Sequence, residues 1–185
     1  MTDNKTINQN FFVITGGPGV GKTTLLNELN NRGYNYIPEA ARQIIKEQME
    51  MNGNALPWGN TTKYKALMLE KSITDYQSAK SNIVTFFDRG IPDTLCYSKV
   101  LGETISTEED TAAWKYRYNN KVFLLPPWRE IYVTDTERKQ DWEEAVRTYE
   151  LMKTTYREYG YEIIEVPKIS VIERADFVIS IKDFK

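Results

Sequence analysis

One stretch of the chain has residue types and spacing suited to holding phosphate. It reads Gly16-Gly17-Pro18-Gly19-Val20-Gly21-Lys22-Thr23 and fits the pattern G-x-x-x-x-G-K-[ST] at every fixed position. Glycines let the backbone curl so that its N–H groups face phosphate oxygens, and a helix beginning at the loop adds partial positive charge. The pattern predicts that Lys22 reaches the β- and γ-phosphates and that the Thr23 hydroxyl coordinates Mg²⁺. The stretch from Gly16 to Thr24 is therefore the predicted site for ATP or GTP with magnesium.

A second polar pair follows an apolar run farther along the chain. Phe86-Phe87-Asp88-Arg89-Gly90 ends a strand predicted over residues 83–87. The carboxyl ends of parallel strands face the ligand in open α/β sheets. Asp88 is thus a candidate ligand of Mg²⁺, directly or through water, and Arg89 could hold a phosphate of the donor or the acceptor. The alternative is a structural ion pair at the strand end, since such pairs are common.

A third polar pair follows the second predicted strand, residues 34–37, in the run Pro38-Glu39-Ala40-Ala41-Arg42. An acid here can take the proton of an attacking hydroxyl, provided that it lies within hydrogen-bond reach. Arg42 is three positions on and therefore on the same helical face. Glu39 is thus a candidate general base, and Glu39 and Arg42 are candidate contacts of the acceptor. Alternatively, Glu39 stabilises the first turn of a helix and Arg42 faces water.

The charged segment 128–147 is predicted to form a lid. Phosphoryl transfer depends on positioning and charge neutralisation, so a cation closing over the γ-phosphate would contribute. Arg138 is the first candidate for this cation, and Arg129 and Arg147 are weaker ones. A solvated helix start is the alternative for each arginine. Two aromatic residues could stack on a base or ring, or else pack in the core: Trp128 and Tyr132.

Short apolar strands alternate with amphipathic helices along the whole chain. Strands are predicted at residues 11–14, 34–37, 83–87, 122–125 and 163–166. Helices are predicted after the glycine-rich loop, from Glu39 to about residue 52, from Thr61 or Thr62, after Pro92, over residues 142–156 and after Ser170. This alternation is typical of a parallel sheet with helices on both faces. We expect one α/β domain of the P-loop NTPase fold over residues 1–185, with a five-stranded parallel sheet, a flexible segment 1–10, an inserted helical region and the lid.

The composition argues against several other classes of protein. The 185 residues are 41% hydrophobic and 27% charged, which suits one soluble globular domain. The net charge of −2 argues against a general nucleic-acid binder. The absence of histidine and the single cysteine, Cys96, argue against a zinc site, a disulfide within the chain and a Ser-His-Asp hydrolase. The apolar run 11–14 is too short for a membrane span, so a cytoplasmic or nuclear protein is expected, with the cytoplasm preferred.

The order of these motifs resembles an AAA-type P-loop ATP-binding family that is similar to ribosylnicotinamide kinase domains and small nucleoside kinases. The resemblance covers nearly all of residues 11–182 and includes Pro-Pro-Trp before the charged segment. It implies an Asp-Arg element at Asp88 and Arg89, as in P-loop nucleoside and nucleotide kinases. It also implies that Glu39 accepts the proton of the attacking hydroxyl, as in deoxynucleoside kinases. Ribosylnicotinamide kinases lack an arginine where this chain has Arg89, so the resemblance implies a small-molecule kinase without specifying the acceptor.

The favoured function is therefore transfer of the γ-phosphate of ATP, with Mg²⁺, to a hydroxyl of a small or nucleoside-like molecule. A carboxylate at Glu39 suits a neutral hydroxyl compound better than a monophosphate, because two negative groups repel. A P-loop NTPase switch and a regulatory nucleotide-binding module remain alternatives. Remodelling ATPases more often have Asp-Glu at the Asp88-Arg89 position, and the guanine-reading Asn-Lys-x-Asp is absent because Val122-Phe123 follows Asn120-Lys121.

Overall fold

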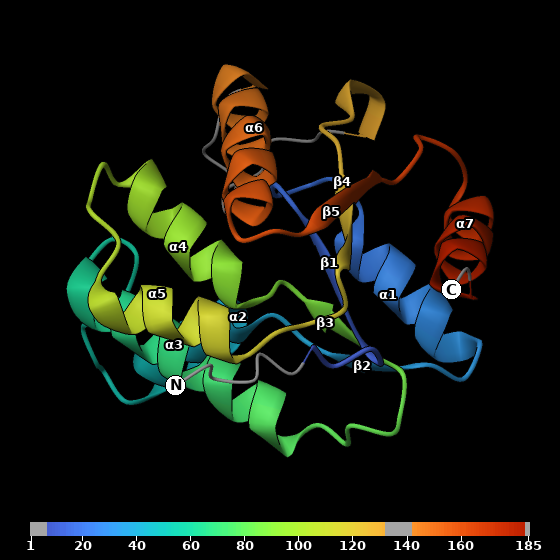
Figure 1. The fold of residues 1–185 in the computed structure, drawn as a ribbon. Coiled ribbons are helices and arrows are strands. Elements are labelled where there is room, and N and C mark those ends of the chain that lie inside the picture. The colour runs from blue at the N-terminus through green and yellow to red at the C-terminus, as the bar shows by residue number, and fades with distance from the viewer. Residues whose placement is uncertain (1–6, 132–141, 184–185) are drawn as a thin grey trace.

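The central feature of the computed structural model is one five-stranded parallel sheet (Figure 1). The structure describes residues 7–131 and 142–183. The strand order is β2-β3-β1-β4-β5, where the strands are β1 (Phe11–Gly16), β2 (Asn35–Ile37), β3 (Thr85–Asp88), β4 (Lys121–Leu125) and β5 (Glu162–Glu165). The chain adds β2 and β3 on one side of β1 and then β4 and β5 on the other side. Open α/β sheets bind ligands at such a change of direction. The predicted parallel sheet is confirmed, with strand ends shifted by one or two residues.

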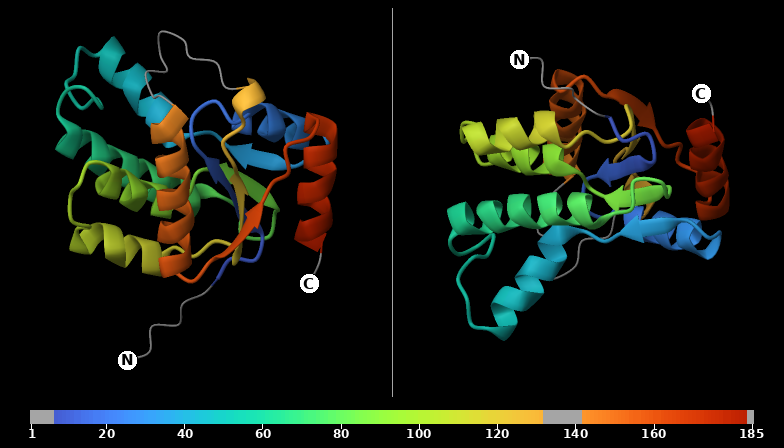
Figure 2. Two further views of the ribbon diagram at one scale, coloured as in Figure 1. Left: turned by 90° about the horizontal axis from the view of Figure 1, so that it is seen from above. Right: turned by 60° about the horizontal axis from the view of Figure 1, so that its bottom comes forward.

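Apolar residues of β1 alternate between two cores, one on each face of the sheet. Phe11 and Val13 pack in one core, towards α4 (Ile91–Val100), α5 (Thr107–Lys115) and α6 (Trp142–Glu158). Phe12 and Ile14 pack in the other core, towards α1 (Lys22–Asn31) and α7 (Val171–Asp183). Figure 2 shows these two groups of helices on opposite sides of the sheet. The sheet is thus covered on both faces, which explains why β1 is a continuous apolar run in the sequence.

The inserted helical region consists of two helices between β2 and β3. They are α2 (Ala40–Glu50) and α3 (Thr61–Ser78), which pack together through Ile44, Tyr64 and Met68. The expected cap of α3 at Thr61 or Thr62 is wrong. Asn60 is the N-cap, because its side chain accepts a hydrogen bond from the Lys63 backbone N–H at 2.9 Å. The start of α2 and one side of α3 line the candidate site.

One helix, α5, was not expected from the sequence. It begins with a capping box in which Ser106 Oγ accepts from the Glu109 N–H, and the Glu109 carboxylate accepts from the Ser106 N–H at 2.8 Å. The spacing S-x-x-E is visible in the sequence and could have indicated this helix. Its apolar side is short: Ala112 and Ala113 are buried in the core, and the half-buried Trp114 packs against it.

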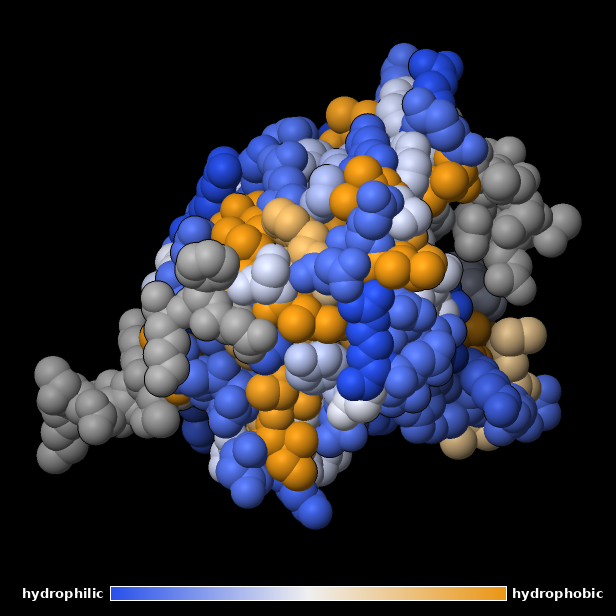
Figure 3. Space-filling view, turned by 90° about the vertical axis from the view of Figure 1, so that its right-hand side faces the viewer, coloured by the Kyte–Doolittle hydropathy of each residue, from blue (hydrophilic) through white to orange (hydrophobic). Residues whose placement is uncertain are grey.

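The face of the molecule that carries α7 has a mixed surface (Figure 3). Hydrophilic side chains separate the apolar ones, so the apolar surface on this face is divided into small areas. Ile172 on α7 has 58% of its surface exposed. Across the described parts of the chain, no helix combines the length and apolarity needed to cross a bilayer.

Candidate functional site

The glycine-rich loop joins β1 to α1 at the centre of the sheet. At Gly16 a Cβ atom would lie 2.7 Å from the carbonyl oxygen of Leu125 on β4, so only glycine fits this close approach. Gly21 is the N-cap of α1 and has a φ of 86°, in the left-handed region that favours glycine. The loop therefore delivers the N-terminus of α1 to the carboxyl edge of the sheet, where backbone N–H groups favour an anion.

Lys22, the first residue of α1, is buried against the same loop. Its Nζ donates hydrogen bonds to the carbonyl oxygens of Gly16 at 3.0 Å and Gly17 at 2.9 Å. Burial, together with the nearby charge of Arg89, lowers the pKa of Lys22 to about 8, although three neighbouring carboxylates act in the opposite direction. The ammonium group thus lies among charges of both signs, in the position expected for a residue that contacts phosphate.

Asp88 ends β3 directly beside the loop, because it pairs with Ile14 in the register of β1 and β3. Its side chain is buried, and burial raises the pKa of its carboxyl group. Its Oδ1 has no hydrogen-bond partner among the described residues. A buried carboxylate oxygen without a donor is suited to a metal ion or its water ligand. Mg²⁺ usually binds to only one or two protein side chains and takes its remaining ligands from phosphates and water. Asp88 and the exposed Thr23, on the first turn of α1, could provide these protein ligands.

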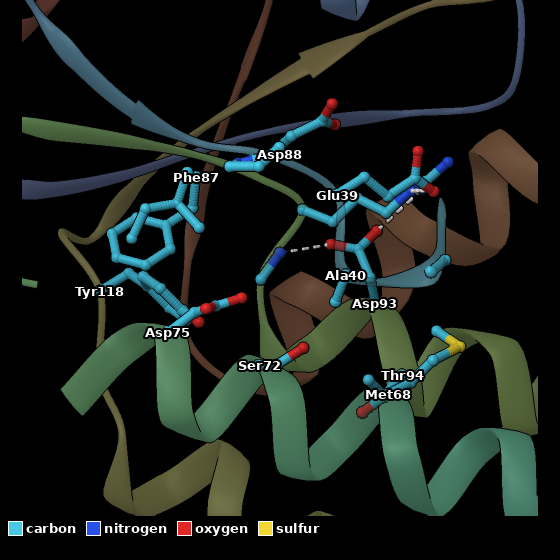
Figure 4. Close-up of a pocket in the computed structure, with 15 residues that line it drawn as sticks. Glu39, Ala40, Met68, Ser72, Asp75, Phe87, Asp88, Asp93, Thr94 and Tyr118 are labelled. Atoms are coloured by element: carbon cyan, nitrogen blue, oxygen red, sulfur yellow. Dashed lines mark hydrogen bonds and ion pairs between the residues drawn. The ribbon is translucent and has the colours of Figure 1, made fainter. Parts of the chain in front are cut away.

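Arg89 connects two carboxylates from different elements. Its Nε donates to Oε1 of Glu39 at 2.8 Å, and its Nη1 donates to Oδ1 of Asp93 at 3.3 Å (Figure 4). The backbone of Arg89 has a φ of 74°, which is strained for a residue with a side chain. Such strain persists where surrounding contacts enforce it, and it gathers at functional sites.

Glu39 lies at the N-cap position of α2, but its side chain does not cap the helix. The carboxylate turns to Arg89 instead, and its Oε2 also lies 3.3 Å from Nε of Arg42. Burial alone would raise the pKa of Glu39. The charges of Arg89 and Lys22 outweigh burial and hold the pKa at about 2. Glu39 is therefore ionised at neutral pH and faces the site, whereas the Arg42 side chain is 71% exposed at its margin.

Asp93, which the sequence analysis did not single out, links this pair to the rest of the fold. Its Oδ1 accepts hydrogen bonds from Thr15 Oγ1 at 2.6 Å and from Arg89, while Oδ2 accepts from the Gly90 N–H at 2.8 Å and the Tyr156 hydroxyl at 2.6 Å. The sequence signal was only that of an acid in the first turn of α4. Its partners come from β1, the turn between β3 and α4, and α6, so the role of this carboxylate depends on tertiary structure.

A pocket opens beside Glu39 and Asp88, between the end of β3 and the two inserted helices (Figure 4). Apolar side chains form much of its wall, including Met68, Phe87 and Tyr118. The polar lining residues that sequence analysis missed are Ser72, Asp75, Asp93 and Thr94. The pocket has a mainly apolar wall with a few polar groups, which is the usual composition of a small-molecule site. Its cavity volume is about 20 Å³, which holds little more than one water, so a larger ligand requires the pocket to widen.

The predicted lid falls partly outside the described residues, which exclude Tyr132 and Arg138. Trp128 is half-buried, and its ring centre lies 5.4 Å from the guanidinium of Arg174. The short 3-10 helix η1 (Arg129–Ile131) follows, and the guanidinium of Arg129 lies 5.5 Å from the ring centre of Trp142. Arg147 is exposed on α6. The lid and its closing arginine remain predictions.

A family model described as the AAA domain matches residues 11–174, which contain the glycine-rich loop, Glu39, Asp88 and Arg89. The chain belongs to this family. The predicted resemblance to an AAA-type P-loop family is therefore confirmed. Matching to the AAA domain ends at Arg174, on the first turns of α7. No curated protein sequence matches the chain.

Solved structures of kinases share the fold of this AAA-domain chain. NadR in complex with NR superposes with a TM-score of 0.64 at 16% identity, over 96% of this chain and 54% of NadR. The chain thus spans about half the length of NadR. Deoxyadenosine kinase from M. mycoides with bound dATP gives 0.55 at 19% identity, covering 92% of this chain and 97% of the kinase. Shikimate kinase from Acinetobacter baumannii in complex with shikimate gives 0.55 at 14% identity, covering 98% and 97%. The structural similarity shows that the chain has the P-loop kinase fold. At identities this low the similarity does not extend to the activity, which has to be argued from the residues of the site.

Proposed function

We propose that the protein is an ATP- and Mg²⁺-dependent phosphotransferase that moves the γ-phosphate to a hydroxyl of a small, nucleoside-like molecule. The observation that carries the proposal is the position of ionised Glu39, which is held by Arg89 close enough to Lys22 for their charges to interact. The Glu39 carboxylate, the Lys22 ammonium group and the buried Asp88 carboxylate lie around one edge of the sheet. This supports their proposed roles as hydrogen-bond acceptor for the attacking hydroxyl, phosphate-binding cation and metal ligand.

On the donor side, the loop N–H groups and Lys22 bind the triphosphate. Thr23 and Asp88 would hold Mg²⁺, which when bound neutralises charge on the phosphate oxygens. Lys22 is held by two loop carbonyls, so its ammonium group is already positioned near the phosphate site. Pre-positioned charge of this kind requires little rearrangement during the reaction.

On the acceptor side, Glu39 accepts a hydrogen bond from the attacking hydroxyl and orients its oxygen towards the γ-phosphorus. A new O–P bond forms, the bond from the γ-phosphorus to the β–γ bridging oxygen breaks, and ADP departs with that electron pair. A carboxylate with a pKa of about 2 is a weak base, so it receives the proton only as the O–P bond forms. This timing suits phosphoryl transfer, whose loose transition state needs positioning and charge stabilisation more than early deprotonation.

The charges around the pocket favour a neutral acceptor over a monophosphate. Glu39, Asp88 and Asp93 are three carboxylates that line the pocket. Arg89 is already paired with two of them, which reduces its capacity to bind a second phosphate. An acceptor phosphate would therefore meet like charge, whereas a sugar hydroxyl could donate to Glu39.

The decisive test is a comparison of acceptors by ADP release and product mass. Neutral nucleosides, their 5′-monophosphates and small polyols are each incubated with ATP, magnesium and the purified protein. We expect acceptor-dependent ADP release and a product heavier by one phosphoryl group for a neutral compound, and neither with Lys22→Ala. ADP release that is the same with every acceptor and without one would support an NTPase instead. Preferential phosphorylation of a monophosphate would overturn the assignment of the acceptor.

A further inference from the structure

Arg174 is a buried arginine whose charge is not balanced by an acid within residues 7–131 or 142–183. It lies in the first turns of α7 with only 5% of its surface exposed. No carboxylate among the described residues forms an ion pair with it, and its Nε is buried without a hydrogen-bond partner. Burial lowers the pKa of this guanidinium, and no charge from the residues that the structure describes acts in the opposite direction. A buried, unpaired cation is costly unless another group supplies the missing negative charge.

The guanidinium of Arg174 lies against the glycine-rich loop. Its Nη1 donates to the carbonyl oxygen of Val20 at 3.3 Å. A Cβ atom on Gly21 would lie only 3.0 Å from Nη1 and 3.1 Å from Nη2, so the absence of a side chain at Gly21 leaves room for this approach. The ring of Trp128 lies near the guanidinium, with 5.4 Å between the guanidinium carbon and the ring centre. The loop itself and the segment that follows β4 thus hold Arg174 in place.

This contact reaches the phosphate site through one peptide group. The Val20 carbonyl belongs to the same peptide as the N–H of Gly21, the N-cap of α1. A hydrogen bond to the carbonyl fixes the orientation of the peptide and polarises it, which strengthens the N–H as a donor. The N-terminus of α1 is where an anion is favoured, and an anion there would also offset the charge of Arg174.

We infer that Arg174 is a positioning residue for nucleotide binding, which holds the Val20–Gly21 peptide for the phosphates and has its own charge balanced by them. The inference rests on the proposed nucleotide site and adds a residue 154 positions away from Val20 along the chain. It also explains why a cation that has no acidic partner in the described part of the chain is buried at the contact between α1 and α7.

Arg32 provides a matched control at the same contact. It lies at the C-cap of α1 and also reaches α7, but it is paired with Glu28 at 2.8 Å and Asp176 at 2.5 Å. An arginine that only joins the two helices should behave like Arg32. Replacing it should lower stability without changing nucleotide affinity. Replacing Arg174 should lower nucleotide affinity without lowering stability.

The test measures thermal unfolding and ATP affinity by calorimetry for wild type, Arg174→Met, Arg174→Lys and Arg32→Met. For Arg174→Met we expect an unchanged or higher unfolding temperature without nucleotide, ATP affinity reduced about tenfold or more, and a smaller stabilisation by ATP. Arg174→Lys keeps the charge but loses the planar guanidinium group, so its ATP affinity should lie between the affinities of wild type and Arg174→Met. Arg32→Met should unfold at a lower temperature and bind ATP like wild type.

Two results would overturn the inference: wild-type ATP affinity in Arg174→Met, or, if that variant does not fold, wild-type affinity in Arg174→Lys. A different result would contradict the proposed phosphotransferase activity. If wild type binds ATP through Lys22 but phosphorylates no acceptor, the transfer proposal is wrong and the Arg174 measurements still decide its role. Absence of ATP binding to wild type would overturn both.

Discussion

Arg89 donates its Nε–H to Oε1 of Glu39 at 2.8 Å, from a backbone with a φ of 74°. Arg89 directly follows β3, and Glu39 lies two residues after the neighbouring strand β2, so that both residues line the pocket. From this strained backbone position the Arg89 side chain forms ion pairs with both Glu39 and Asp93. This pair therefore provides the first test of the proposed reaction.

Replacing Glu39 by Gln should abolish most phosphate transfer and leave ATP affinity nearly unchanged. The amide retains the size of the side chain but loses the charge that orients and accepts the hydroxyl proton, so turnover should fall by about 10²-fold or more. Initial rates of product formation and ATP calorimetry measure the two effects. Arg42→Gln is the control, because this partner of Glu39 is 71% exposed and should change turnover much less. Normal turnover in Glu39→Gln would remove Glu39 from the reaction.

The Glu39–Arg89 pair should also contribute to stability in a defined pH window. The pKa of Glu39 is lowered from 4.5 to about 2 in the folded protein, so the folded state binds this proton less readily than the unfolded chain. The contribution is complete above pH 4.5 and is lost as the pH falls towards 2. Its size is about 3 kcal/mol. Urea unfolding should show that the stability difference between wild type and Glu39→Gln shrinks over this window, whereas a constant difference would contradict the linkage.

ATP affinity should fall as the pH rises above about 8, the lowered pKa of Lys22. Phosphates bind the charged amine, so once the free protein loses this proton, affinity should decrease by about tenfold per pH unit. Lys22→Arg stays charged and should show no such slope, whatever its absolute affinity.

The stability of the nucleotide-free protein should increase with pH over the range in which ATP affinity decreases. Between about 8 and 10.5 only the unfolded chain binds the proton, so the free energy of unfolding rises with pH.

Asp88→Asn should raise the magnesium concentration needed for activity by about tenfold or more, because the amide is a poorer ligand for a hard cation. Stability without nucleotide should not fall, since the variant removes a buried charge whose Oδ1 has no partner among the described residues. Magnesium titrations of turnover measure the first effect and thermal unfolding the second. Asp75→Asn is the control, because Asp75 lines the same pocket but is paired with Lys71. An unchanged magnesium requirement in Asp88→Asn would favour a purely structural role.

Tyr156→Phe should lower both stability and turnover through Asp93. It removes the hydroxyl that donates to Asp93 Oδ2 at 2.6 Å inside the core, at a cost of about 1–3 kcal/mol. Asp93 then holds Arg89 less firmly, so turnover should fall while ATP affinity stays near wild type. Tyr159→Phe removes a similar bond, 2.6 Å to the exposed Asp110, and should cost less stability and leave turnover unchanged. Equal turnover in Tyr156→Phe and Tyr159→Phe would show that the contact to Asp93 does not affect catalysis.

Local features of the site could be predicted because their signals lie within a few residues. The glycine-rich loop needs close backbone approaches and left-handed φ values, so its composition is visible in the sequence. Glu39 and Arg42 form a pair three residues apart on one turn, which spacing alone indicates. Helix ends were less certain. The cap of α3 moved to Asn60, since neighbouring polar residues compete for that position.

The sequence by itself determined the parallel α/β fold, the phosphate loop and the two acids at the strand ends, because apolar periodicity and glycine spacing are local properties. Tertiary structure alone decided that Arg89 pairs with Glu39, which lies 50 positions away, and that Tyr156 donates to Asp93 across 63 positions. It likewise placed Arg174 on the loop at Val20. A buried polar side chain is partnered by whichever group the packing of helices on the sheet brings within reach, and no local pattern encodes that distance.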